Sequence, residues 1–344
     1  MWSRGWWSHV SDLKRWRCFR YADDVNPLAT PPVLFITFCR PESTAQVFNV
    51  IRAARPARLF IAQDGPRANR PEDVENCRQT RAIATAVDWP CEVRTRFQER
   101  NLGVGVGCWT AIRWFFEHVE EGIILEDDVV PEASFFPYCA ELLDRYRHDT
   151  RVMHIAGYNP LLTPVGDASY YFSPYMHCWG WASWRRVARQ YDYALSDWPR
   201  FKMSGLMKTQ FESSLQRRHF EAVFDLYHRG GCNNWDQQWM YLILSRGGLC
   251  INPCVNLVRN IGFGTASSFA QNIWSYHAHR TTAPMEMPLR HPDFVLPYPG
   301  IRCRILRQAS GLFWPRMLAV RLAKPFLPLI LKAGNFMLRK RSRD

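Results

Sequence analysis

The sequence predicts an α/β fold with a mostly parallel central sheet flanked by helices. Short apolar segments alternate with helical segments from residue 32 to about residue 146, which is the spacing of strand–helix units in parallel sheets. Several apolar segments end in polar residues, most clearly where Ile123-Ile124-Leu125 runs into Glu126-Asp127-Asp128. With 344 residues, 47% of them hydrophobic, the chain is large enough to bury a full core, which argues against disorder.

The first strand is expected at residues 32–40, and Pro41 begins a helix to about residue 54, because proline is tolerated in the first helical turn. The next elements are a strand at 57–65, a helix at 70–87, a strand at 91–97, a helix ending near 118, a strand ending at 126–128 and a helix at 132–146. After residue 150 we expect a strand at 151–158, a helix at 210–229, a helix at 239–244 and a pair of short strands in 248–258.

Polar side chains follow three of the expected strands: Arg40, then Gln63-Asp64, then Glu126-Asp127-Asp128. Because parallel strands end at one edge of a sheet, these side chains should converge there. Three adjacent carboxylates repel one another, so a cation is expected to neutralise them. Carboxylate oxygens suit Mn²⁺ or Mg²⁺, which also bridge phosphate oxygens. The alternative is a solvated acidic loop or a helix N-terminus.

The glycine spacing Gly103-x-Gly105-x-Gly107 is not the dinucleotide-binding fingerprint, which requires G-x-G-x-x-G directly after the first strand. A flexible entry into the following helix, without a further role, remains an open interpretation. Residues 159–200 are dense in aromatic side chains, which commonly form core. Those next to glycine or serine, as in the segment 177–184, could instead form a stacking wall for a sugar or base.

Asp236 lies at or near the start of an expected helix, after the turn Gly230-Gly231 and between Trp235 and Trp239. One interpretation is a helix N-cap. The other is a general base whose pKa the two tryptophans raise by excluding water.

Taken together, these motifs resemble glycosyltransferases of the GT-A fold, which use nucleotide-diphospho-sugars. The similarity is greatest to bacterial proteins distantly similar to N-acetylglucosaminyltransferase I, and it covers about residues 31–298. The segments that carry it are 35–41, 63–64, 101–103, 122–128, 179–185, 235–239 and 256–264. One departure is Thr265-Ala266-Ser267-Ser268-Phe269, where a Thr-His-Thr-like sequence is frequent, so no histidine is assigned to the metal or phosphate.

The resemblance implies a role for each predicted site residue. The metal ligand would be Asp128, holding Mn²⁺ (or Mg²⁺) on the diphosphate. The donor-binding residues would be Asp127 at the ribose, Glu126 at the donor sugar, Asp64 at the base and Arg40 beside the nucleotide or diphosphate. The general base would be Asp236, which would take the proton of the acceptor hydroxyl.

The expected function is transfer of a sugar, with inversion, from a nucleotide-diphosphate donor (expected to be a UDP-sugar) to a glycan or lipid-linked acceptor in surface polysaccharide assembly. Two alternatives remain: a metal-dependent nucleotidyltransferase, and a sugar-binding protein that has lost catalysis. The expected domains are an N-terminal Trp/Arg-rich extension at 1–30, a catalytic domain at 31–298 and a basic amphipathic tail at 299–344. The catalytic domain would comprise a nucleotide-sugar half at 31–150 and an acceptor half at 151–298.

The positive charge is concentrated in the tail. Residues 301–344 contain eleven Lys or Arg and one acid, which is +10 of the total net charge of +13 and leaves +3 for the rest. A nearly balanced body argues against a nucleic-acid groove, and the tail favours an anionic membrane surface over a helix packed on the body. The eleven cysteines have no zinc-site spacing. We therefore expect reduced thiols and a cytoplasmic protein peripheral to the membrane, without a spanning segment.

Overall fold

The computed structural model describes residues 29–161, 163, 165–211, 213–263 and 280–309, and it confirms the predicted fold class. An eight-stranded mixed sheet has the order β3-β2-β1-β4-β8-β6-β9-β7, and a two-stranded sheet pairs β10 with β5. The strands are β1 Val33–Thr37, β2 Arg58–Gln63, β3 Glu92–Phe97, β4 Glu121–Glu126, β5 Val129–Pro131, β6 Val152–Ala156, β7 Tyr170–Ser173, β8 Trp181–Trp184, β9 Leu249–Pro253 and β10 Val258–Asn260. The helices are α1 Pro41–Ala54, α2 Glu72–Ala84, α3 Val104–His118, α4 Phe135–Arg145, α5 Arg185–Ala188, α6 Trp198–Met203, α7 Met207–Gln210, α8 Ser214–His228, α9 Asp236–Ser245 and α10 Ile301–Ala309.

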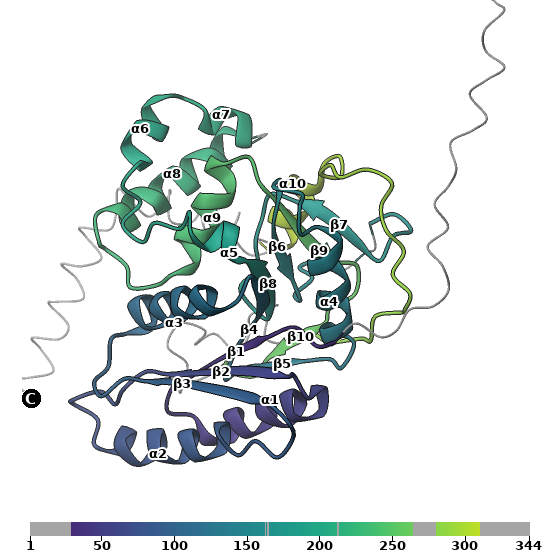
Figure 1. The fold of residues 1–344 in the computed structure, drawn as a ribbon. Coiled ribbons are helices and arrows are strands. Elements are labelled where there is room, and N and C mark those ends of the chain that lie inside the picture. The colour runs from purple at the N-terminus through teal and green to yellow at the C-terminus, as the bar shows by residue number, and fades with distance from the viewer. Residues whose placement is uncertain (1–28, 162, 164, 212, 264–279, 310–344) are drawn as a thin grey trace, which may run out of the picture.

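The first four strands of the sheet, β3-β2-β1-β4, are all parallel. Helices α1 and α2 cover one face of this half and α3 covers the other (Figure 1). All five residues of β1 are therefore buried, as expected for a parallel strand covered on both faces. The carboxyl ends of β1, β2 and β4 lie at one edge, where the polar strand ends were predicted to converge.

The second half joins the same sheet through β8, which lies antiparallel between β4 and β6. Strand β6 pairs in parallel with β9, and β7 pairs with β9 in the antiparallel sense. Both β7 and β8 come from the aromatic-rich segment, for which no strands were predicted. Trp181 and Trp184 are at most 2% exposed, so they are core, whereas Trp179 is only partly buried.

The two short strands expected within 248–258 are observed as β9 and β10, although β10 begins only at Val258 and the two do not pair with each other. Strand β9 joins the main sheet, and β10 instead pairs with β5, directly after the acidic turn. Between the two strands, the Asn256 side chain donates to the Val258 and Thr281 carbonyls and so redirects the chain. The amide of Ile261 then donates to the Asp128 carbonyl at 2.8 Å. This pairing brings a distant segment against the acidic turn.

The helices α6–α9 form a layer beside the sheet in the second half (Figure 1). Aromatic side chains hold this layer together: Trp198 packs edge-on against Phe224 and Tyr241. The expected helices at 70–87 and 132–146 are each shorter, at Glu72–Ala84 and Phe135–Arg145.

The start of the predicted tail packs on the body as α10, through buried Ile301 and Ile305. Arg302 also donates to the Gln210 carbonyl at 2.7 Å. Residues 310–344 and 1–28 lie outside the described residues, so the membrane-binding tail and the N-terminal extension stay predictions. Within the described part of the chain, no helix is long and apolar enough to span a membrane.

Candidate active site

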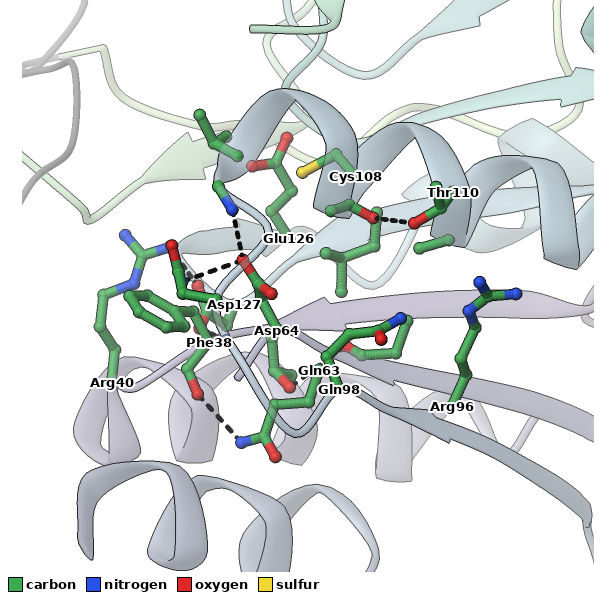
Figure 2. Close-up of a pocket in the computed structure, with 18 of the residues that line it drawn as sticks. Phe38, Arg40, Gln63, Asp64, Arg96, Gln98, Cys108, Thr110, Glu126 and Asp127 are labelled. Carbon is green, nitrogen blue, oxygen red and sulfur yellow. Dashed lines mark hydrogen bonds and ion pairs between the residues drawn. The ribbon is translucent and has the colours of Figure 1, made fainter. Parts of the chain in front are cut away.

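A cavity of about 230 Å³ lies at the carboxyl ends of β1, β2 and β4, against the N-terminus of α3 (Figure 2). Four predicted site residues line it: Arg40, Asp64, Glu126 and Asp127. Asp128 and Asp236, also predicted, are not among the lining residues. The convergence of the strand ends is therefore observed for all three strands.

Arg40 bridges two carboxylates of the acidic turn. It donates from Nη1 to Asp128 Oδ2 at 2.6 Å and from Nη2 to Asp127 Oδ1. Asp127 is 2% exposed, and its second oxygen accepts from the amide of Phe38 at 2.8 Å. Burial opposes the charge on Arg40, but the attraction of Asp127 and Asp128 raises its pKa. This pairing neutralises part of the negative charge that the sequence predicted would need a cation.

Glu126 is the carboxylate of the turn that remains unpaired. It projects toward the cavity in Figure 2, and no hydrogen bond to it is found among the described residues. Burial and the neighbouring charge of Asp128 raise the pKa of Glu126 to about 8, while Arg40 opposes this shift. The charges of Asp127 and Asp236 also raise this pKa, by smaller amounts.

Asp64 has both carboxylate oxygens occupied by its own protein. Oδ1 accepts from the amides of Gly65 and Leu102, both at 2.9 Å. Oδ2 accepts from the Asn101 side chain at 3.0 Å and from the amide of Gly103 at 3.1 Å. A carboxylate offers about four acceptor positions. Asp64 therefore anchors the loop that begins α3, and its contact with a nucleotide base stays a prediction.

Asp236 is the first residue of α9, but it does not cap the helix. Trp235 is the N-cap residue, and no side chain makes a capping hydrogen bond, so the N-cap interpretation is wrong. Asp236 Oδ2 accepts from Gln237 Nε2 at 3.2 Å, whereas the buried Oδ1 has no partner among the described residues. Burial raises the pKa of Asp236. A carboxylate with a free oxygen and a raised pKa is suited to accept a proton.

Trp235 and Trp239, which flank Asp236 in the sequence, are core residues, and their shielding of Asp236 stays a prediction. Both are at most 2% exposed. The ring of Trp181 stacks on Trp235 at 5.5 Å and meets Trp239 edge-on at 4.8 Å. The start of α9 therefore rests on the central sheet through β8.

The glycine-rich loop meets the segment that precedes Asp236. Gly103 has φ of +79°, and a Cβ there would lie 2.3 Å from Asn233 Nδ2. A Cβ on Gly105 would lie 2.3 Å from Tyr193 Oη and 2.4 Å from Asn233 Oδ1. The Gly105 amide donates to that same oxygen at 3.0 Å. The glycines therefore permit a close contact between the two halves, and they do more than make the helix entry flexible.

The acidic turn fits a divalent cation only in part. Among the described residues, no group of three or more His, Cys, Asp or Glu could hold a metal ion. Asp127 has both oxygens engaged, and Asp128 has Oδ2 engaged by Arg40. Mg²⁺ commonly takes only one or two carboxylates and completes its shell with substrate phosphates and water. The donor set is therefore compatible with a cation that takes further ligands from a diphosphate and water, and Asp128 as its protein ligand stays a prediction.

Several residues that line the cavity were not predicted. Arg96 and Gln98 come from the carboxyl end of β3, and Arg67 and Asn101 come from the loops after β2 and β3. The strand-end rule that found Asp64 applies equally to β3 and would have indicated Gln98. Arg67 is held at the rim by its ion pair with Asp73 at 2.6 Å, a contact with no local sequence signal.

No family model matches the chain, and no curated protein does. Among solved structures it is similar to a mannosyltransferase from Pyrobaculum calidifontis in complex with GDP-Man and Mn²⁺, with 12% identity over 65% of this chain and 71% of that one and a TM-score of 0.33. It is also similar to a UDP-glucose pyrophosphorylase complexed with UDP-glucose (8% identity, 64% and 90% of the chains, TM-score 0.33). A third is mouse xyloside xylosyltransferase 1 (11% identity, 63% and 82%, TM-score 0.31). Likeness at this level assigns no activity, substrate or metal to this chain.

Proposed function

We propose that this chain is a metal-dependent glycosyltransferase that moves a sugar from a nucleotide-diphosphate donor to an acceptor hydroxyl, with inversion. The observation that carries the proposal is a cavity lined by carboxylates and an arginine, together with a buried carboxylate, Asp236, that has a free oxygen among the described residues. Glu126 and Asp127 line this cavity at the edge of a parallel sheet. Asp236 does not line it, and its charge raises the pKa of Glu126. Ligands of open α/β sheets bind outside the carboxyl ends of the strands.

In this proposal, the chain supplies a binding surface and a base. Asp236 Oδ1 accepts the proton of the acceptor hydroxyl, because it has no other partner among the described residues and its pKa is raised. Arg40 supplies positive charge at the cavity. Asp128 holds the metal, which, when bound, stabilises the charge that develops on the leaving diphosphate.

The donor site can be tested by thermal shift with UDP, GDP and CDP, each with and without Mn²⁺. A ligand present at a hundred times its dissociation constant stabilises the native state by about 2.7 kcal/mol. We expect a shift with UDP that requires Mn²⁺ and is lost in Asp128→Ala. No shift with any nucleotide would contradict the donor site.

The general base can be tested with Asp236→Asn, which preserves the shape of the side chain. We expect transfer to fall by roughly 10² to 10⁴-fold, the usual contribution of general base catalysis, with the donor-induced thermal shift unchanged. Equal loss of donor binding and rate would mean that Asp236 is structural. Release of nucleoside diphosphate supports transfer, whereas release of pyrophosphate would favour the nucleotidyltransferase. A tight donor complex with neither product would favour the binding protein.

The acceptor and the membrane are further parts of the proposal. We propose a glycan or lipid-linked acceptor in surface polysaccharide assembly, and a tail that contacts anionic lipid from the cytoplasmic side. Because α10 packs on the body, the matched truncation should remove residues 310–344 and leave α10 in place. Loss of flotation with anionic vesicles is expected for this truncation, and unchanged flotation would contradict the membrane contact.

A further inference from the structure

The feature that carries a further inference is the ion pair network of Arg40 with the acidic turn. We propose that Arg40 is a tethered counter-ion that competes with the divalent cation for Asp128, so that the cation binds only when the guanidinium leaves. This inference rests on the proposed function, because it concerns the same metal ligand. It assigns Arg40 a role in the ligand-free protein that differs from contacting the donor.

The geometry shows a guanidinium fork spread over two consecutive carboxylates. One terminal nitrogen contacts Asp128 and the other contacts Asp127, while the side chain of Arg40 is only 24% exposed. The carboxylate repulsion that would favour a metal ion is therefore already relieved by an internal cation. A guanidinium suits this position because its planar donors match two acceptors at once.

The backbone of Ile261 and Gly262 restricts the positions open to the Asp128 side chain. A Cβ on Gly262 would lie 2.1 Å from Asp128 Oδ2, and the Asp128 carbonyl accepts from the amide of Ile261. The close approach of Gly262 therefore limits the space around Asp128 Oδ2, the same oxygen that accepts from Arg40. Under this constraint, the arginine and a metal ion compete for one fixed carboxylate.

When Arg40 is paired with the acidic turn, one of its hydrogen-bond donors has no partner. This reduces the free energy needed to move the guanidinium away from the carboxylates. The Nε of Arg40 is buried and has no hydrogen-bond partner among the described residues. A buried donor without a partner is costly. Because Arg40 also lines the cavity, a diphosphate bound there would give the released guanidinium an anionic partner. The cation and the diphosphate should therefore bind cooperatively, and the cation alone should bind weakly.

The test is a Mn²⁺ titration of the full chain without nucleotide, followed by the EPR signal of free Mn²⁺. The variants are Arg40→Gln, Arg40→Lys and Asp128→Asn. Arg40→Gln removes the charged hydrogen bond to Asp128 that Mn²⁺ would otherwise have to displace. The dissociation constant for Mn²⁺ should therefore fall by roughly 10 to 100-fold in this variant. Arg40→Lys, which keeps the charge but cannot bridge both carboxylates, should lie between wild type and Arg40→Gln. This second variant keeps the test valid if Arg40→Gln does not fold.

The matched control is Arg147→Gln. Arg147 makes a two-point pair with a single carboxylate, Glu121, at the other end of the same strand β4, so its loss should leave Mn²⁺ affinity unchanged. Unchanged affinity in both Arg40 variants, together with loss of binding in Asp128→Asn, would overturn the competition and leave the proposed function standing. Wild-type affinity in Asp128→Asn would instead overturn the metal ligand itself, and with it the proposed metal dependence.

Discussion

Replacing Asp64 by alanine should destabilise the fold, because Asp64 ties the loop before α3 to the end of β2. The change removes three hydrogen bonds across this junction, from Asn101, Leu102 and Gly103. Each hydrogen bond to a charged group contributes about 1.5 kcal/mol at the lower end of its range. Water in the cavity can replace part of the three lost hydrogen bonds, so we expect the free energy of unfolding to fall by about 3 kcal/mol in total. For a domain of this size, that corresponds to a fall in Tm of roughly 4 to 6 °C.

The assay is thermal unfolding of wild type, Asp64→Ala and Asp64→Asn without ligand. The asparagine preserves the volume but turns one acceptor into a donor that faces the loop's own donors, so it should cost nearly as much as alanine. Wild-type Tm in Asp64→Asn with complete loss of nucleotide binding would refute the anchoring role. That result would favour the base contact that the resemblance implies.

Three further changes probe the packing around the site. Alanine normally stabilises a helix, but the new methyl group in Gly105→Ala overlaps Asn233. We therefore expect this change to lower the free energy of unfolding by about 1 to 3 kcal/mol in denaturant titration. An unchanged midpoint would contradict this contact. Burial lowers the pKa of His154 to about 3, below the value of about 6.5 in the unfolded chain. As pH falls, the unfolded state therefore binds the proton first, and the free energy of unfolding decreases by about 1 kcal/mol between pH 6.5 and pH 5.5. His154→Gln should lack this decrease when unfolding is measured against pH. A pH profile identical to that of wild type would refute the assignment. Trp181→Phe should lower kcat more than donor affinity, because Trp181 supports the turn before Asp236; an equal effect on both would argue against this support.

The half of the site contributed by strand ends could be predicted from the sequence. Alternation of apolar and helical segments fixes a parallel sheet, and parallel strands direct their carboxyl ends to one edge. Arg40, Asp64 and Glu126 each follow directly from that rule, and each lines the cavity. Their partners could not be predicted in the same way. The loop after β3 occupies the acceptor positions of Asp64, and Arg40 pairs with Asp127. Both contacts depend on side-chain directions that no local sequence pattern encodes.

The second half was less predictable because its strands do not follow chain order. Strand β8 enters the sheet between β4 and β6, so Trp181 pairs with Ile124 across a long sequence separation. Its four residues are all buried and aromatic or small, a composition equally consistent with a buried helix segment or a binding wall. Only the observed register establishes that the aromatic cluster is core.

That register also explains how Asp236 is positioned relative to β4. Ile124 is two residues before Glu126, its partner Trp181 stacks on Trp235, and Trp235 directly precedes Asp236. The Tyr191 hydroxyl donates to the Trp235 carbonyl at 2.8 Å and fixes the same turn from another side. The position of the proposed base is thus determined by packing on the sheet. Because a rigid apolar support leaves the carboxylate of Asp236 without competing donors at Oδ1, the same packing that places this side chain also keeps it free to accept a proton.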